Sequence, residues 1–200
     1  MAKLLYIKAN PKGNEESRTF KISEAFIEEY IKHHPDDEII TLDLYKEQLP
    51  FLNKENINEI FSKKDPSNIP PLLKYAYEFK EVDKYVIAEP LWNLSIPSIL
   101  KAYIDLICVT GVTFKYTENG PVGLCTNKKA INITTRGGNY EEPPMSDLEL
   151  GDRYLKTIFG FLGITDYTTI SANELDVIGK DIDQIVNQAI TEAKNLAKDF

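Results

Sequence analysis

The sequence predicts an α/β fold in which helices cover both faces of a parallel sheet of five strands. Five short runs rich in apolar and β-branched residues recur along the 200 residues, each with the length of a strand buried on both faces. Amphipathic segments with helical spacing separate these runs, and this alternation is typical of parallel sheets. Hydrophobic residues make up 42% of the chain, enough for a core within one domain over residues 1–200.

The predicted strands are apolar runs that end in polar or glycine-containing loops. They are placed at residues 3–9, 38–44, 84–88, 129–134 and 168–172. Right-handed crossover connections leave few topologies for five such strands. Among the doubly wound orders, five strands favour 2-1-3-4-5, the flavodoxin-like arrangement.

The predicted helices carry apolar residues at helical spacing; in the first one charged residues lie on the opposite side, whereas in the one at 152–162 the apolar residues nearly encircle the helix. These helices are placed at residues 17–33, 72–79, 97–109, 152–162 and 182–197. Pro97 suits the first turn of its helix, where the missing N–H has no helical partner to lose. Residues 45–71 contain four prolines and no steady period, so we expect an insertion that is mostly loop with one short helix.

The charge and the cysteine count exclude several classes of function. The formal net charge of −8 repels phosphate backbones and anionic lipids, so neither a nucleic acid nor a membrane is an expected partner. Two cysteines are too few for a disulfide scaffold or a four-cysteine metal site, and the acidic clusters lack histidine, so no metal is expected. With no signal-peptide pattern and no uninterrupted apolar helix, the sequence predicts a cytoplasmic protein.

Ligands of doubly wound sheets bind beyond the carboxyl ends of the strands, where the strand order reverses. Here that place lies among the loops after the first, third and fourth strands. The first loop begins at Asn10 and delivers Ser17, Arg18 and Thr19 to the start of a helix. N–H groups, hydroxyls and the helix dipole favour a phosphate there. A serine before a helix is also an ordinary N-cap, so both interpretations stay open.

The other two loops carry an aromatic ring and a pair of glycines. Pro-Leu-Trp-Asn-Leu at 90–94 places Trp92 at a strand end, where it either faces a planar heteroaromatic ligand or packs under its loop. Thr-Arg-Gly-Gly at 135–138 either lets the backbone approach a ligand, with Arg136 supplying a positive charge, or forms a plain turn. Because the predicted fold brings the three loops together, it favours the binding-site interpretation. These loops contain no nucleophile elbow and no Cys/His pair, which suits chemistry carried by a cofactor.

Over residues 2–200 the chain resembles the FMN-dependent NADH-azoreductases, a branch of the flavodoxin-like quinone reductases. The most specific match is Gly-Val-Thr-Phe-Lys-Tyr-Thr-Glu-Asn-Gly-Pro-Val-Gly-Leu at 111–124, joined by the loops at 90–94 and 135–138 and by Gly-Phe-Leu-Gly-Ile at 160–164. The resemblance implies a homodimer with one FMN per subunit. The residues that it assigns to FMN are Asn10, Ser17, Arg18, Thr19, Leu91, Trp92, Asn93, Leu94, Thr135, Arg136, Gly137 and Gly138.

Two further aromatic residues match the family, and three positions differ from it. Tyr116 and Phe161 look like the aromatic walls over the flavin, with Phe161 reaching in from the partner subunit. Asn10 stands where some relatives carry serine, and its amide can also donate a hydrogen bond. Leu94 replaces an aromatic residue, which implies a looser pocket, while Thr135 in place of serine keeps the hydroxyl.

The resemblance also implies the reaction. NADH passes a hydride to the flavin and leaves, and a quinone or an aromatic azo compound then takes its place, which gives ping-pong kinetics. NADPH is not separated from NADH by any feature of the sequence. Two other readings remain, a flavodoxin-type electron carrier that needs a separate reductase and an interaction module without flavin. A response regulator is disfavoured, because Asn10 and Pro11 stand where it needs an acidic pair.

Overall fold

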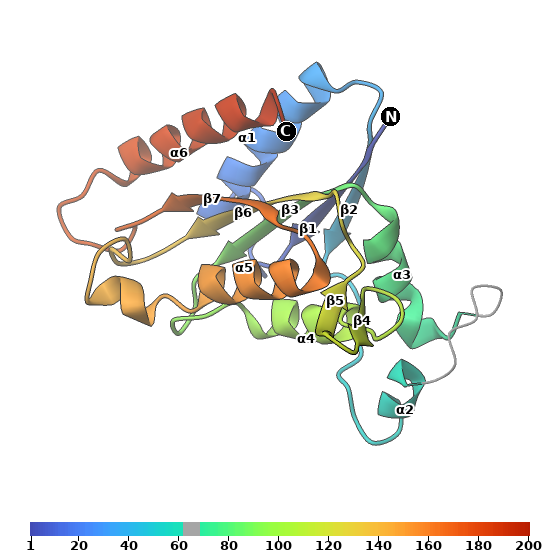
Figure 1. The fold of residues 1–200 in the computed structure, drawn as a ribbon. Coiled ribbons are helices and arrows are strands. Elements are labelled where there is room, and N and C mark those ends of the chain that lie inside the picture. Colours follow the sequence, from blue (N-terminus) through green and yellow to red (C-terminus); the bar gives the residue numbers. More distant parts are fainter. Residues whose placement is uncertain (62–68) are drawn as a thin grey trace.

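A computed structural model of the chain describes residues 1–61 and 69–200. Its main sheet has five strands in the order β2-β1-β3-β6-β7, and every neighbouring pair is parallel. These strands are β1 (Lys3–Lys8), β2 (Glu38–Asp43), β3 (Lys84–Pro90), β6 (Lys129–Thr135) and β7 (Asp166–Ala172). Counted within this sheet alone, the order is 2-1-3-4-5 (Figure 1), so the predicted flavodoxin-like fold is confirmed.

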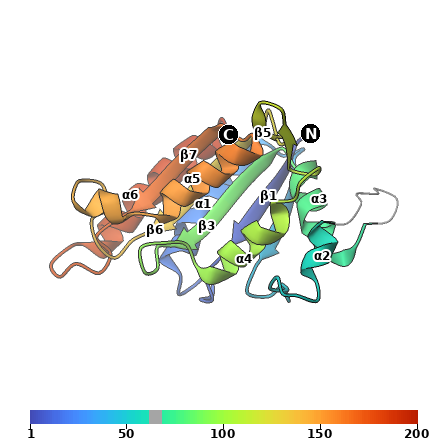
Figure 2. The ribbon, with the colours of Figure 1, turned by 60° about the horizontal axis from the view of Figure 1, so that its bottom comes forward.

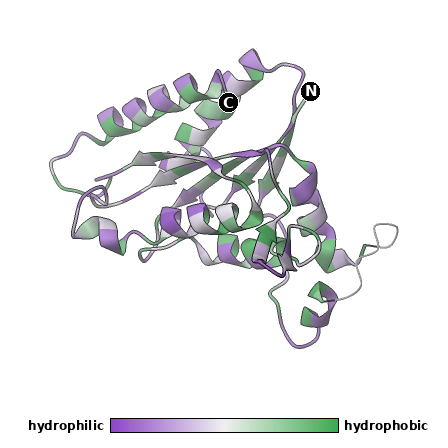
Figure 3. Cartoon of the chain, in the orientation of Figure 1, coloured by the Kyte–Doolittle hydropathy of each residue, from purple (hydrophilic) through white to green (hydrophobic). Residues whose placement is uncertain are grey.

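Helices cover the two faces of the sheet in separate groups (Figures 1 and 2). The long helices are α1 (Arg18–His33), α3 (Lys74–Glu81), α4 (Ser98–Ile107), α5 (Gly151–Leu162) and α6 (Ile182–Ala197). One core cluster joins α1 and α6 to the sheet through Phe26 and Ala193, and another joins α3, α4 and α5 to it through Phe79 and Phe159. Hydrophobic and hydrophilic stripes alternate along these helices (Figure 3), as expected where one side packs on a core.

A hairpin that was not predicted adds two strands outside the main sheet. It consists of β4 (Phe114–Thr117) and β5 (Gly120–Gly123), which pair antiparallel. Glu118 and Asn119 form the turn, and Gly120, which begins β5, has a φ of 106° that suits glycine. An Asn-Gly pair is a strong hairpin signal, so the local sequence did contain the necessary information.

The helix predicted at 97–109 is shorter than expected at both ends. Pro97 is the N-cap residue rather than part of the first turn. At the other end, the Thr113 hydroxyl donates to the carbonyl oxygen of Ile107 at 2.6 Å and accepts from the N–H of Val109 at 3.0 Å. Thr113 thus takes up backbone groups at this helix end, and the helix stops at Ile107.

The insertion predicted at 45–71 contains one short helix in its described part, α2 (Ile57–Ile60). Residues 62–68 of this insertion lie outside the described residues. The chain then re-enters the core through a 3-10 turn (Pro71–Leu73) that leads into α3. Among the described residues, no helix is both long and apolar enough to cross a membrane.

Candidate functional site

A cleft of about 300 Å³ opens at the carboxyl ends of β1, β3 and β6, as the strand order predicts. We call it the strand-end cleft. The predicted site residues that line it are Asn10, Ser17, Arg18, Thr19, Leu91, Trp92, Thr135, Arg136 and Gly137. The structure therefore brings the three predicted loops together. Asn93, Leu94 and Gly138 belong to the same loops but do not line the cleft.

Ser17 caps α1 and still has a proton to offer the cleft. Its hydroxyl oxygen accepts from the Phe20 N–H at 3.1 Å and from Nδ2 of Asn10 at 3.0 Å. The N-cap and the binding-site interpretations are therefore compatible, since accepting two bonds leaves the O–H free to donate. The N–H groups of Arg18 and Thr19 lie in the first turn of α1, where a helix offers them no internal partner. Hydroxyl, N–H groups and dipole together suit an anion.

A direct hydrogen bond between Thr19 and Thr135 joins the start of α1 to the end of β6. Their hydroxyl oxygens are 2.6 Å apart, and both side chains belong to buried residues. In such a pair one hydroxyl donates to the other, so one proton remains for a ligand. The main-chain N–H of Leu91 also donates to the carbonyl oxygen of Thr135 at 2.9 Å, which fixes the loop after β3 against the same residue.

The tryptophan loop is a tight two-residue turn. The main chains of Trp92 and Ser95 exchange hydrogen bonds of 2.9 and 3.0 Å around Asn93 and Leu94. Asn93 has a φ of 50° and Leu94 a φ of 67°, and only the asparagine is a residue that adopts this region readily. The turn holds Trp92 at the edge of the cleft with 40% of its surface exposed, which, of the two alternatives, favours a ring that faces the cleft.

Arg136 does not supply the free positive charge that the sequence suggested. Its side chain is buried, and Nη2 lies 3.7 Å from Oε1 of Glu149. Because the carboxylate balances much of the guanidinium charge, the cleft gains less attraction for anions than a free arginine would give. The Nε of Arg136 is buried and has no hydrogen-bond partner among the described residues.

A buried glutamate lies directly behind this wall. Glu89, the penultimate residue of β3, is fully buried, and Nδ2 of Asn132 lies 3.4 Å from its Oε1. Burial raises the pKa of Glu89 to about 7, against the lowering effect of Thr134, Asn132 and Arg136. A charged residue within an apolar strand was the available signal, and the sequence analysis did not use it.

The loop after β7 also lines the cleft, and the sequence analysis missed it. Leu175 and Asp176 both border the cleft. Nη1 of Arg18 donates to the carbonyl oxygen of Leu175 at 2.9 Å and to Oδ1 of Asp176 at 3.1 Å. Arg18 is therefore held by this loop, and its charge, like that of Arg136, is partly neutralised by a carboxylate.

Tyr116 and Phe161 lie together, away from the cleft of their own chain. Both contact Phe114, with ring-centroid distances of 5.6 Å to Tyr116 and 4.7 Å to Phe161. The start of α5 borders the tryptophan loop, since the Leu150 N–H donates to the Leu94 carbonyl at 2.9 Å. Phe161 lies at the other end of this helix, about 15 Å further along.

Taken together, the cleft fits a flat ligand that ends in a phosphate. Hydroxyls and first-turn N–H groups gather at the start of α1, while Leu91 and Trp92 offer apolar surface at the next strand end. Gly137 carries no Cβ, and the nearest atom to one placed there would be Oδ2 of Asp176, at 2.6 Å, which belongs to an exposed side chain. FMN has both a phosphate and a flat ring and matches this donor set.

Comparisons with known proteins show what this chain is similar to. A family model described as flavodoxin-like fold matches residues 2–197. The FMN-dependent NADH:quinone oxidoreductase 2 of Clostridium acetobutylicum is 61% identical over 200 residues and covers 100% of both chains. An azoreductase structure from Bacillus anthracis str. Sterne is 36% identical, with a TM-score of 0.91 and 100% of both chains covered. An FMN-dependent NADH-azoreductase from Bacillus anthracis str. Ames Ancestor, solved in complex with FMN, is 31% identical, with a TM-score of 0.90 over 100% of this chain and 99% of that one.

The doubly wound sheet with a ligand cleft at its strand ends defines a protein of the flavodoxin-like fold, and the chain belongs to that family. More narrowly, the chain belongs to the family of FMN-dependent NADH:quinone oxidoreductases and azoreductases. The resemblance found in the sequence motifs is thereby confirmed. The names of these relatives favour an enzyme over an electron carrier.

Proposed function

We propose that the strand-end cleft binds FMN and that the chain is an NADH-dependent oxidoreductase of quinones and aromatic azo compounds. The observation that carries the proposal is the meeting of three loops, with their hydroxyls, free N–H groups and apolar side chains, in one cleft. When bound, FMN supplies hydride transfer from NADH to the acceptor, so a quinone becomes a hydroquinone and an azo compound becomes two amines. NADPH is a second donor to be compared in the same assay.

The start of α1 would hold the phosphate. The donors there would be the Ser17 hydroxyl, the first-turn N–H groups of Arg18 and Thr19, and the one hydroxyl proton that the pair of Thr19 and Thr135 leaves free. Asn10 would act by orienting the Ser17 hydroxyl, because Nδ2 of Asn10 donates to it. Several neutral donors and a helix dipole then bind the phosphate, although the nearby arginines are paired with carboxylates.

The two remaining loops would hold the ring. Leu91 and Trp92 offer the apolar surface, and the backbone around Gly137 offers hydrogen-bond donors. Donors fixed in a partly dry cleft stabilise negative charge that develops on a bound ring. Asn93, Leu94 and Gly138 would act indirectly, by shaping the turns that present these groups.

We further propose that two copies of the chain complete the site. Tyr116 and Phe161 are exposed or half-buried aromatic residues, and Phe161 lies about 15 Å along α5 from the end of that helix that borders the cleft. If these rings cover a flavin, they cover that of a second copy. Two-fold pairing supplies each cleft with an aromatic wall from the other subunit.

Steady-state kinetics test the proposed function. Purified chain supplied with FMN is mixed with NADH and a quinone, and the concentrations of both substrates are varied. We expect NADH oxidation without any added reductase, with parallel double-reciprocal lines, because donor and acceptor use one place in turn. NADH oxidation that requires a separate reductase would instead identify an electron carrier.

A further inference from the structure

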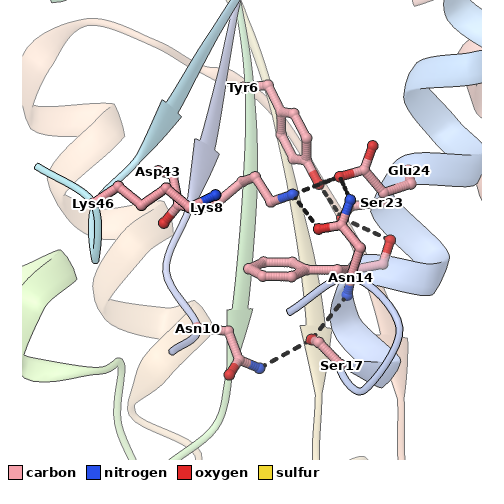
Figure 4. A network of polar contacts seen from close by, with 10 residues as sticks. Tyr6, Lys8, Asn10, Asn14, Ser17, Ser23, Glu24, Asp43 and Lys46 are labelled. Atoms are coloured by element: carbon pink, nitrogen blue, oxygen red, sulfur yellow. Dashed lines mark hydrogen bonds and ion pairs between the residues drawn. The ribbon is translucent and has the colours of Figure 1, made fainter. Parts of the chain in front are cut away.

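A cluster of polar contacts around Lys8 ties the loop at 10–17 to β1 and α1 (Figure 4). We call Lys8, Asn14 and Glu24 the lysine cluster. Nζ of Lys8 donates to Oδ1 of Asn14 and to Oε1 of Glu24, both at 2.6 Å. Nδ2 of Asn14 donates to the same Glu24 oxygen at 3.0 Å, so the asparagine bridges both ions. None of the three residues is needed for any contact proposed above.

The loop has little else to hold it in place. Residues 11–16 are all exposed, so no apolar side chain anchors this part of the loop. A hollow of about 400 Å³ lies beside it, lined by Lys8, Phe20 and Asn14 among others. A Cβ placed on Gly13 would meet no atom within 4 Å. The position of the loop therefore depends on its hydrogen bonds rather than on packing.

The hydrogen bonds lead from Asn14 to the phosphate donors in two steps. Asn14 follows Gly13, whose carbonyl oxygen accepts from the N–H of Ser17 at 3.0 Å. Ser17 in turn caps α1 and offers its hydroxyl to the cleft. The hydrogen bond that holds Asn14 against Lys8 of β1 thus fixes the turn that sets the position of Ser17.

Burial of the Lys8 ammonium group costs free energy, and the packing of β1 does not require a lysine at this position. Lys8 ends β1 with only 8% of its side chain exposed, whereas burial of an ammonium group is unfavourable unless it is paired. Glu24 pairs with it, and the ring of Phe20 lies 4.3 Å from Nζ. Tyr6 and Ser23 complete the surroundings, with their hydroxyl oxygens 2.6 Å apart. An apolar residue would end the strand more cheaply, so the ion pair points to a role in holding the loop.

We propose that Lys8, Asn14 and Glu24 position the phosphate-binding loop and thereby make the chain select a phosphorylated flavin over the same ring without phosphate. This inference rests on the proposed binding of FMN. A loop that samples several positions is competent to bind only part of the time, and its apparent affinity falls by that fraction. Only a ligand that carries the phosphate loses affinity in this way.

Asn14→Ala is the variant that isolates the tether. It leaves the ion pair of Lys8 and Glu24 intact and removes only the link to the loop. Dissociation constants for FMN and for riboflavin, which lacks the phosphate, are measured by quenching of flavin fluorescence. We expect binding of FMN to weaken about tenfold and that of riboflavin to stay within about twofold. Lys8→Met, where it folds, should show the same selective loss.

Asn195→Ala is the matched control, since Asn195 is exposed on α6 and accepts only from Nζ of Lys198 among the described contacts. It should bind both flavins as the unchanged chain does. Equal affinity of Asn14→Ala and the unchanged chain for FMN would overturn the inference, and so would an equal loss of both flavins. If the unchanged chain binds neither flavin, the proposed function itself fails, which is a separate and distinguishable result.

Discussion

The hydroxyl oxygens of Thr19 and Thr135 lie 2.6 Å apart, although 116 residues separate them in the sequence. Thr19 is in the first turn of α1, and Thr135 is the last residue of β6. This bond joins the loop proposed to hold a phosphate to the loop proposed to hold a ring. The two parts of the strand-end cleft are therefore fixed relative to each other before any ligand binds.

Thr135→Val tests the value of this bond. Valine keeps the shape of threonine, removes the hydroxyl and leaves Thr19 without that partner. We expect a loss of about 1 kcal/mol in the free energy of unfolding, measured by urea titration. FMN affinity should also fall, because one hydroxyl proton at the cleft is lost. Thr157→Val is the matched control, since the Thr157 hydroxyl donates only to the Arg153 carbonyl on an exposed part of α5, and it should leave FMN binding unchanged.

Glu89 should make the protein less stable as the pH rises. Burial raises the pKa of its carboxyl to about 7, above the ordinary value of 4.5, so the folded chain keeps a proton that the unfolded chain releases. Between pH 4.5 and 7 the free energy of unfolding therefore falls with rising pH, by about 3 kcal/mol in total from this group. Urea titrations at several pH values between 5 and 8 measure this slope.

The Glu89→Gln variant isolates the contribution of the Glu89 carboxyl to this pH dependence. Glutamine keeps an oxygen for Asn132 and cannot ionise, so most of the slope between pH 5 and 8 should disappear. Asp37 provides the contrast, because hydrogen bonds from Tyr30 and Ala2 and the nearby Lys84 overcome the effect of burial and lower its pKa to about 2. Its contribution is constant above pH 5 and is lost only in acid. An unchanged slope in Glu89→Gln would contradict the assignment.

Gly123 is expected to tolerate no side chain. A Cβ there would lie 2.2 Å from the main-chain nitrogen of Gly163 and equally close to the carbonyl carbon of Leu162. Since backbone atoms cannot move aside as a flexible side chain can, Gly123→Ala should separate the hairpin from α5 and cost about 3 kcal/mol or more. Thermal unfolding followed by circular dichroism measures the loss.

Gly160→Ala is the comparison for that variant. Gly160 lies in α5, and an added Cβ would meet nothing within 4 Å. The alanine should raise the free energy of unfolding by about 0.5–1 kcal/mol, the ordinary difference between the two residues in a helix. Equal effects of the two substitutions would show that the close approach at Gly123 is absent.

Leu94 occupies a backbone conformation that leucine disfavours. With a φ of 67° it pays strain that glycine would not, so Leu94→Gly should stay within about 1 kcal/mol of the unchanged chain despite the lost side chain. Leu91, equally half-buried but without a positive φ, should lose about 2–3 kcal/mol on the same change. Urea titration of the two variants side by side gives the comparison.

The sheet and its order were predictable because each strand is a separate apolar run and the connection rules leave few alternatives. The meeting of the loops at Ser17, Trp92 and Thr135 followed from the same order, since carboxyl ends of parallel strands lie at one edge. These parts of the site needed no knowledge of side-chain contacts. The hairpin at Asn119 and Gly120 was also within reach of local turn chemistry.

What the sequence could not provide were the partners of charged groups. Arg136 looks like a free cation along the chain, and only the fold places Glu149 beside it. Arg18 likewise contacts Asp176, which comes 158 residues later. Lys8 stands in an apolar run, but the asparagine and glutamate that hold it lie on a loop and on a helix. Such pairings depend on packing between elements, which a residue pattern along one element does not encode.

The binding of FMN in a form that NADH can reduce is most directly tested by an anaerobic absorbance spectrum. The purified chain is incubated with FMN, freed of excess, and treated first with NADH and then with a quinone. We predict a stoichiometric amount of bound flavin, whose visible absorbance bleaches with NADH and returns with the quinone. A chain that retains no FMN, or whose bound FMN keeps its absorbance in the presence of NADH, would contradict the proposed function.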